Sequence, residues 1–108
     1  MAAKFGQQLF SIKGIIYSSS ANGVYVKNGK DWTKVLDDGW VRFMGGNDVN
    51  NLFAVGGLET IYWYNGSVWK RITVPDIGDT PLYGVWTDGK ETFIVGNDGT
   101  RTYILHGK

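Results

Sequence analysis

Few residues in this chain could perform acid–base or metal chemistry. His106 is the only histidine, cysteine is absent, and Asp37-Asp38 is a pair of adjacent carboxylates. A single His without Cys cannot form a familiar zinc site or a catalytic triad. Because the two aspartates precede Gly39, we interpret them as a solvated turn rather than as a paired acid and base. The sequence therefore predicts a protein that is not an enzyme, with no catalytic residues, no metal site and no cofactor.

Four side chains have types and spacing suited to carbohydrate. Sugar-binding proteins use aromatic faces with a neighbouring Asp, Asn or Arg, whose polar atoms hydrogen-bond the hydroxyls. Trp40 with Arg42, and Trp86 with Asp88, have this composition. These four residues are candidate ligand-binding residues. The alternative is that both tryptophans pack in the core or between repeats.

Charge and hydropathy exclude several partners. Eleven basic and ten acidic residues are scattered singly and give a net charge of +1. Nucleic acid or an anionic membrane surface would require clustered Lys and Arg, so neither is expected as a partner. No apolar stretch approaches the roughly 20 residues of a membrane span. The first residues lack the apolar run of a secretion signal, so we expect a soluble, unprocessed chain of otherwise unknown location.

The elements that must position these residues are short strands. Sixteen glycines and an aromatic content of 15% in 108 residues are typical of strands joined by tight turns, and no long segment keeps a helical apolar stripe. We expect eleven strands, at 9–12, 15–18, 24–27, 32–36, 40–44, 52–55, 61–64, 69–74, 83–86, 92–95 and 102–105. The predicted fold class is all-β.

The strands belong to a repeat. Segment 61–69 repeats segment 24–32, and 92–96 repeats 52–56, while 83–86 matches 41–44. A third copy of the first segment begins at residue 102. The repeat anchors are a turn glycine and a tryptophan, namely Gly29, Gly66, Gly107, Trp32 and Trp69. An Asn-Gly turn favours positive φ, which places His106-Gly107 in the same turn column as Asn28-Gly29 and Asn65-Gly66.

Each unit reads as four strands with a period of about 40 residues, which is typical of a β-propeller blade. The whole chain, 1–108, is predicted to be a single half-propeller unit, with blade 1 at about 8–36, blade 2 at about 40–74 and blade 3 at about 82–108. Blade 3 lacks a fourth strand. Residues 1–7 have the pattern of that strand, since Lys4 aligns with Lys34 and Arg71. The predicted ring-closure strand is Ala2, Ala3, Lys4 and Phe5.

One segment resembles a known family. Residues 48–69, read as D-V-N-N-L-F-A-V-G-G-L-E-T-I-Y-W-Y-N-G-S-V-W, are similar to a bacterial propeller repeat with the consensus D-v-f-a-V-G-x-x-G-t-I-x-x-Y-d-G-x-x-W, and residues 82–108 repeat most of it. The resemblance implies a non-enzymatic binding or scaffolding module from larger secreted or surface proteins. A chain of three blades also resembles a fragment or a designed piece of such a ring.

Three four-stranded blades cannot close a ring, because known propellers hold about four to eight blades. We therefore expect a homodimer with six blades, in which residues 1–7 of each chain complete blade 3 of its neighbour. The predicted function is a self-assembling scaffold whose natural ligand is unknown. The alternative is a carbohydrate-binding lectin with repeated aromatic sites between blades.

Overall fold

The computed structural model describes residues 6–20, 22–57, 60–74 and 80–107. Its strands are β1 (Gly6–Ile12), β2 (Ile15–Ser20), β3 (Gly23–Asn28), β4 (Asp31–Leu36), β5 (Val41–Asp48), β6 (Asn51–Gly56), β7 (Ile61–Tyr64), β8 (Trp69–Arg71), β9 (Leu82–Thr87), β10 (Thr92–Asn97) and β11 (Thr102–Gly107). All eleven predicted strands are present, and the all-β class is confirmed. The described residues form no helix, and hence none that could cross a membrane.

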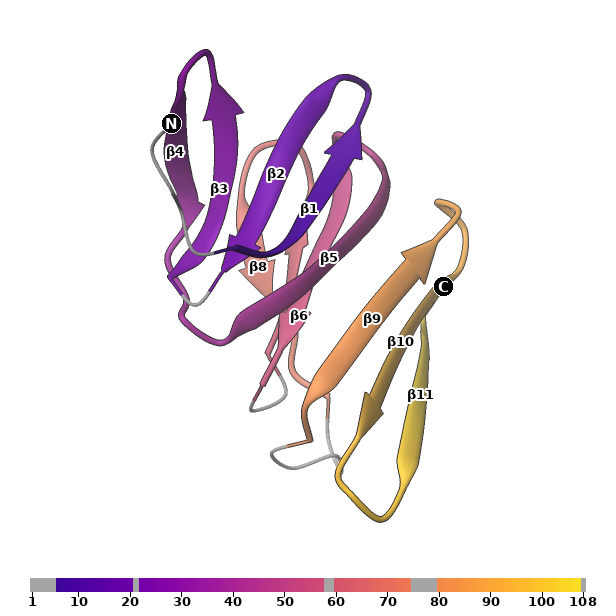
Figure 1. The fold of residues 1–108 in the computed structure, drawn as a ribbon. Coiled ribbons are helices and arrows are strands. Elements are labelled where there is room, and N and C mark those ends of the chain that lie inside the picture. The colour runs from indigo at the N-terminus through magenta and orange to yellow at the C-terminus, as the bar shows by residue number, and fades with distance from the viewer. Residues whose placement is uncertain (1–5, 21, 58–59, 75–79, 108) are drawn as a thin grey trace.

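The strands form three antiparallel sheets, each ordered as in the sequence. The first sheet is β1-β2-β3-β4, the second is β5-β6-β7-β8, and the third is β9-β10-β11 (Figure 1). Connected neighbours pair with one another because short turns suit antiparallel hairpins. Within the described residues, the third sheet has three strands where the other two have four.

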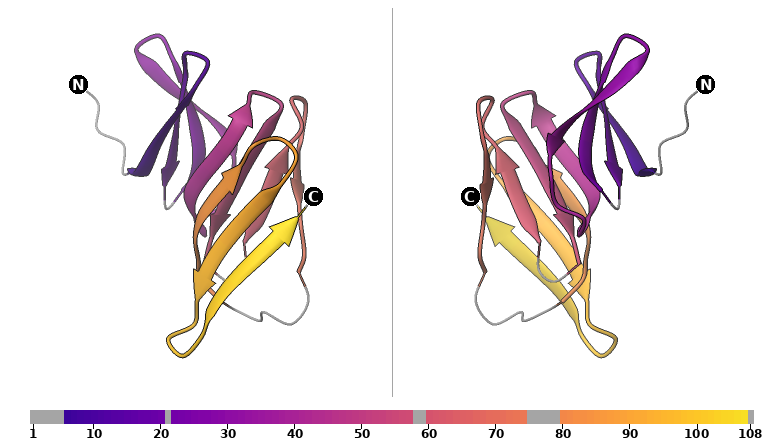
Figure 2. Two further views of the ribbon diagram at one scale, coloured as in Figure 1. Left: turned by 90° about the vertical axis from the view of Figure 1, so that its right-hand side faces the viewer. Right: turned by 90° about the vertical axis from the view of Figure 1, so that its left-hand side faces the viewer.

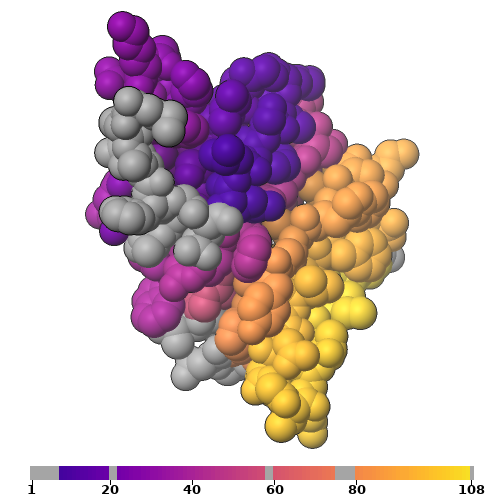
Figure 3. Space-filling model, in the orientation of Figure 1, coloured from indigo at the N-terminus to yellow at the C-terminus, as the bar shows by residue number. Residues whose placement is uncertain are grey.

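The sheets stack face to face along the chain. Their first strands, β1, β5 and β9, lie side by side, and the remaining strands of each sheet extend away from this row (Figure 2). The second sheet is in the middle, so the first and third sheets lie at opposite ends of the molecule (Figure 3). Within the described residues, the second sheet therefore has a neighbouring sheet on both faces, whereas each end sheet has one on a single face.

Two hydrophobic cores fill the two spaces between the sheets. The core between the first and second sheets is built from the buried residues Tyr17, Val24, Val41, Met44, Leu52 and Ala54. The core between the second and third sheets is built from Val55, Ile61, Leu82 and Ile94. Successive residues of β6 enter different cores, as expected when side chains alternate across a sheet with two covered faces.

A β-bulge at the same place in each sheet establishes how the three sheets correspond. The pairing of the first two strands skips one residue, which is Gln7, Arg42 or Tyr83. Aligning the bulges matches Val41 with Leu82, so the predicted match of 41–44 with 83–86 is wrong by one residue. The error matters because a one-residue shift moves every side chain to the other face.

The glycine that recurs near the end of the second strand in the second and third sheets has a steric cause. A Cβ on Gly56 would lie 1.7 Å from the carbonyl oxygen of Trp40, and a Cβ on Gly96 would lie 2.6 Å from that of Pro81. These carbonyls accept hydrogen bonds from the next residues along, Gly57 (3.0 Å) and Asn97 (3.2 Å). The glycine thus lets the chain entering each sheet dock against the second strand.

Candidate functional site

The most unusual surface is the uncovered face of the third sheet. Trp86, Phe93 and His106 are aligned across β9, β10 and β11. The rings of Phe93 and His106 stack with centroids 4.6 Å apart, and those of Trp86 and Phe93 are 6.0 Å apart. Val95 and Ile104 form the next row, because β10 and β11 pair at these residues. We call these five residues the free face of the third sheet.

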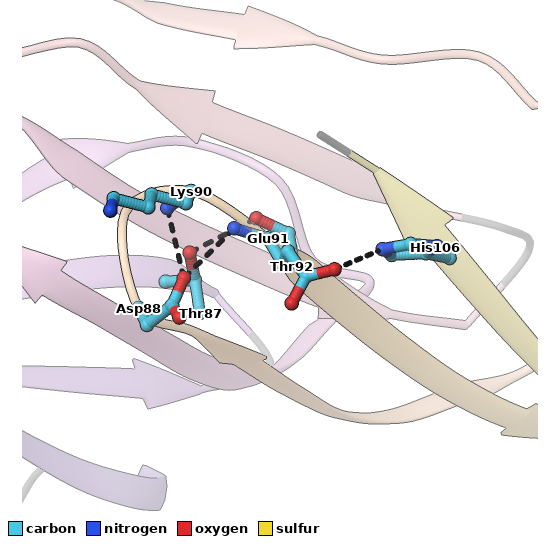
Figure 4. Close-up of polar contacts among 6 residues, drawn as sticks. All are labelled: Thr87, Asp88, Lys90, Glu91, Thr92 and His106. Carbon is cyan, nitrogen blue, oxygen red and sulfur yellow. Dashed lines mark hydrogen bonds and ion pairs between the residues drawn. The ribbon is translucent and has the colours of Figure 1, made fainter.

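A polar turn borders the free face. The Asp88 carboxylate accepts hydrogen bonds from the backbone N–H groups of Lys90 (2.9 Å) and Glu91 (2.8 Å), and these bonds lower the pKa of Asp88. Glu91 in turn lies 3.2 Å from the His106 Nε2 atom (Figure 4). Inside the turn, the Thr92 hydroxyl lies 3.0 Å from the Thr87 hydroxyl. Asp88 therefore shapes the loop between β9 and β10.

The two predicted sugar-binding pairs have different surroundings. Trp86 belongs to the aromatic row on the sheet face, whereas Asp88 caps the turn beyond the strand. Their side chains have separate structural tasks.

Trp40 and Arg42, in contrast, lie together, with the guanidinium carbon 5.9 Å from the centre of the Trp40 ring. They line a cavity of about 370 Å³ with the exposed Tyr83. The Arg42 Nη1 atom donates to the carbonyls of Gly39 (2.8 Å) and Val41 (3.1 Å), which fixes its position.

The second and third sheets carry the same kind of apolar residues at equivalent positions but differ in the exposure of these residues. Ile104 lies opposite Val95, as Ile61 lies opposite Val55 in the second sheet. Val55 and Ile61 are 0% and 1% exposed, whereas Val95 and Ile104 are 40% and 66% exposed. A pattern of apolar residues that is buried in one sheet is thus exposed at its equivalent positions in another.

The face of the first sheet that points away from the second sheet repeats this contrast at Leu9. Leu9 lies opposite Ser18, as Met44 lies opposite Ala54. Met44 is 4% exposed, but Leu9 is 69% exposed. Ile16 and Tyr25 share this face because they alternate with the core residues of β2 and β3. We call Leu9 and Ile16 the free face of the first sheet.

The repeat anchors lie at corresponding positions in two sheets only. Trp32 pairs with Lys27, and Trp69 pairs with Tyr64 on the equivalent strands. Trp69 stacks on Tyr64 at 5.0 Å and packs against the first core.

The turn glycines Gly29 and Gly66 have positive φ values of 63° and 100°. Gly107, however, pairs with Thr92 inside β11. The predicted placement of His106 and Gly107 in a turn is therefore wrong. Thr102–Gly107 is paired along its whole length, and Ile104 rather than Thr102 is equivalent to Ile61, so Gly107 matches Tyr64 and not Gly66.

The predicted ring-closure strand, Ala2, Ala3, Lys4 and Phe5, lies outside the described residues. The basic column with which Lys4 aligns is present in both four-stranded sheets. Lys34 pairs with Tyr25 and Arg71 pairs with Tyr62, and each cation lies 5.7 Å from the centre of the tyrosine ring.

The start of β1 limits how that segment could be used. Gly6 and Gln7, predicted to precede the first strand, belong to β1. Four residues, 37–40, connect β4 to β5, whereas none would connect Phe5 to Gly6. To pass from the fourth strand of one sheet to the first strand of the next, the chain must cross three strand spacings, which span about 14 Å. One residue advances the chain by only about 3.8 Å. Strand exchange in the predicted alignment therefore requires the start of β1 to break its pairing with Ser19 and Ser20 on β2.

Asp38 has a role that the sequence did not indicate. Its carboxylate accepts a hydrogen bond from the Tyr62 hydroxyl (2.7 Å) and from the Trp40 backbone N–H (2.8 Å), and lies 3.7 Å from Arg71. Burial raises the pKa of Tyr62, and the bond to Asp38 raises it further. Asp38 thus ties the connection between the first two sheets to the second sheet. In the sequence, only the alignment of Tyr62 and Arg71 with Tyr25 and Lys34 could have suggested a carboxylate partner here.

No protein-family model matches the chain, and no curated protein or solved structure matches it. Within the part of the chain that the structure describes, no cluster of three or more His, Cys, Asp or Glu side chains could hold a metal ion. The arrangement offers apolar contact surfaces at both ends of the stack.

Proposed function

We propose that the chain is a non-enzymatic, self-assembling scaffold of the β-propeller type, in which two copies close a ring of six sheets. The observation that carries the proposal is the exposure of Val95, Ile104 and Leu9 at positions whose equivalents are buried between sheets. Burial of apolar surface is the main favourable term in association. Residues selected for such burial at two ends of one molecule favour a partner at each end.

A second copy is a suitable partner because it offers both ends at once. The two free faces are different surfaces, so each contact joins the third sheet of one copy to the first sheet of the other. Contacts between unlike surfaces form a ring when the rotation closes. Two copies give six sheets, which is within the usual range of about four to eight, whereas three copies would give nine.

The faces can be tested by introducing charge. Ile104→Lys is expected to shift the assembly to a folded chain of 12.0 kDa, because the ammonium group cannot be buried without a partner. Light scattering coupled to gel filtration measures the mass, and circular dichroism checks that the sheets remain. Val68→Lys is the matched control, since Val68 is equally apolar and exposed but lies in the turn between β7 and β8.

The outcomes separate clearly. Assembly by the unmodified chain and by Val68→Lys, but not by Ile104→Lys, would support the proposal. A stable species of 12.0 kDa from the unmodified chain at micromolar concentration would overturn it.

Strand exchange is a finer part of the proposal. In it, residues 2–5 of one copy add a fourth strand to the third sheet of the other, next to β11. Within the described residues β11 pairs only with β10, so its outer edge has backbone groups for a further strand. Deletion of residues 1–5 leaves all of β1 in place and is expected to weaken the ring. If the truncated chain assembles with unchanged affinity, exchange is excluded while assembly through the faces stands.

Carbohydrate binding is a second candidate, favoured by the cavity beside Trp40. Two exposed aromatic rings, Trp40 and Tyr83, and the fixed guanidinium of Arg42 line it. We expect Trp40→Ala to abolish retention on any glycan array spot that the unmodified chain binds, with Trp86→Ala as the comparison at the other predicted pair. An array without binding at millimolar sugar would remove this candidate.

A further inference from the structure

The two free faces have a template inside the molecule, namely the contact between the first and second sheets. On the side of that contact formed by the first sheet, Phe10 pairs with Tyr17, and Val24 follows on β3. The bulge alignment assigns Trp86, Phe93 and Ile104 to the same three positions of the third sheet. The free face of the third sheet therefore repeats aromatic, aromatic and β-branched residues in the same order.

The opposite side of the template is repeated more closely. The second sheet presents Met44, Leu52, Tyr62 and Trp69 to the first core. The equivalent residues of the first sheet, on the side that points away from the second sheet, are Leu9, Ile16, Tyr25 and Trp32. Even the cation beside the tyrosine recurs, because Lys34 lies over Tyr25 as Arg71 lies over Tyr62. Leu9 is 69% exposed where its equivalent Met44 is 4% exposed, so the set that packs in the template leaves a large apolar side chain exposed here.

The second internal contact is a poorer template. There, a Cβ on Gly45 would lie 2.5 Å from the carbonyl oxygen of Val85, so the second and third sheets approach closely only because residue 45 is glycine. Trp86 occupies the position equivalent to Gly45. A contact made by the free face of the third sheet must therefore be wider, like the one that accommodates Phe10.

From this repetition we infer that the third sheet of one copy packs on the first sheet of a second copy in the register of the first internal contact. The inference rests on the proposed self-assembly and specifies its interface. In the template, the Gln8 side chain accepts a hydrogen bond of 2.6 Å from the Met44 backbone N–H. Gly84 is equivalent to Gln8, and Leu9 to Met44. Residue 84 of one copy therefore faces residue 9 of the other.

Single cysteines can test this register, because the chain contains no Cys of its own. Gly84→Cys is tolerated, since the nearest atom to its Cβ would be a Val95 methyl group at 3.5 Å. Leu9→Cys replaces an exposed side chain. We expect the two variants, mixed and treated with a short bismaleimide, to convert to a species of twice the 12.0 kDa chain mass. Each variant alone is expected to stay at 12.0 kDa in denaturing gels.

The outcomes distinguish this inference from the proposed function. Light scattering first establishes whether each variant still assembles. Assembly with cross-links within one variant alone would mean that like faces meet, which overturns the inference but not self-assembly. The mixture of Leu9→Cys and Val68→Cys is the control that sets the background of cross-linking. If the Gly84→Cys and Leu9→Cys mixture assembles but cross-links no more than this background, the inference is also overturned. Absence of assembly in the unmodified chain would instead overturn the proposed function.

Discussion

The second and third sheets have similar sequences but different surroundings. Val55 and Ile61 of the second sheet are buried against the third sheet. Val95 and Ile104, the equivalent pair in the third sheet, are exposed. The second sheet also has its fourth strand, β8, where the third sheet ends at β11 within the described residues. The comparison shows that the same pattern of apolar residues is buried in one sheet and exposed in the next. Within the part of the chain that the structure describes, the third sheet has the apolar pattern of a sheet packed on both faces but has a neighbour on one face only.

The largest expected effect is the difference in stability between two separate variants, one that truncates a buried leucine and one that truncates an exposed leucine. Leu52 is fully buried in the first core, and Leu9 is at the free face of the first sheet. We expect Leu52→Ala to lower the free energy of unfolding by about 3 kcal/mol, through lost burial and the cavity left behind. At concentrations low enough to keep the chain monomeric, Leu9→Ala should cost less than about 0.5 kcal/mol. Urea denaturation followed by tryptophan fluorescence measures both.

Concentration sharpens this comparison. If the free faces meet in an assembly, the cost of Leu9→Ala should grow as the protein concentration rises, because association stabilises the folded chain by mass action. The cost of Leu52→Ala should change far less. A cost for Leu9→Ala that is independent of concentration would show that the free face of the first sheet stays uncovered.

The strand order was predictable because hairpins alternate with turn signals throughout. Each of the eleven predicted strands overlaps an observed one, and the repeat of 24–32 at 61–69 holds in three dimensions, where Trp32 and Trp69 share a position. Alignment was less predictable. The match of 41–44 to 83–86 failed by one residue because a β-bulge, at Arg42 and again at Tyr83, leaves no mark in composition.

The site was only partly predictable. Trp40 and Arg42 lie close because they are two residues apart where the chain enters β5, which spacing alone indicates. The aromatic row of Trp86, Phe93 and His106 depends on the pairing of three strands, so it requires the register of β11. That register was misplaced when Gly107 was aligned with turn glycines. A glycine in a strand and a glycine in a turn are indistinguishable in a sequence unless the turn requires positive φ.

A smaller effect is expected from adding one methyl group at a covered and at an uncovered glycine. Gly56→Ala would place a Cβ 1.7 Å from the Trp40 carbonyl oxygen, so the backbone must move. We expect a loss of about 2 kcal/mol in the free energy of unfolding. Gly107→Ala meets no atom within 4 Å and should change stability by less than about 0.5 kcal/mol. Thermal unfolding of the two variants provides the comparison, and equal losses would contradict it.

The smallest expected effect concerns acid, to which the two sheets should respond differently. In the turn between β10 and β11, the Asp98 carboxylate accepts hydrogen bonds from the backbone N–H groups of Thr100 (2.9 Å) and Arg101 (2.8 Å), which lower its pKa from 3.8 to about 2. The turn between β7 and β8 uses Asn65 in the same way, with bonds from Ser67 and Val68. An amide does not titrate in this range, so of these two turns only the one in the third sheet is sensitive to acid.

The sign follows from the direction of the shift. A carboxylate with a lowered pKa in the folded state stabilises that state fully above pH 3.8, and this contribution is lost as the pH falls through about 2. Asp98→Asn keeps the acceptor oxygen but removes the proton equilibrium. We therefore expect the stability of the variant to decline less than that of the unmodified chain over this pH range. Amide hydrogen exchange at Thr100 and Arg101, with Ser67 and Val68 as internal controls, locates the loss. Equal acceleration in both turns would show that acid loosens the second and third sheets together, and the difference between their turns would then be without consequence.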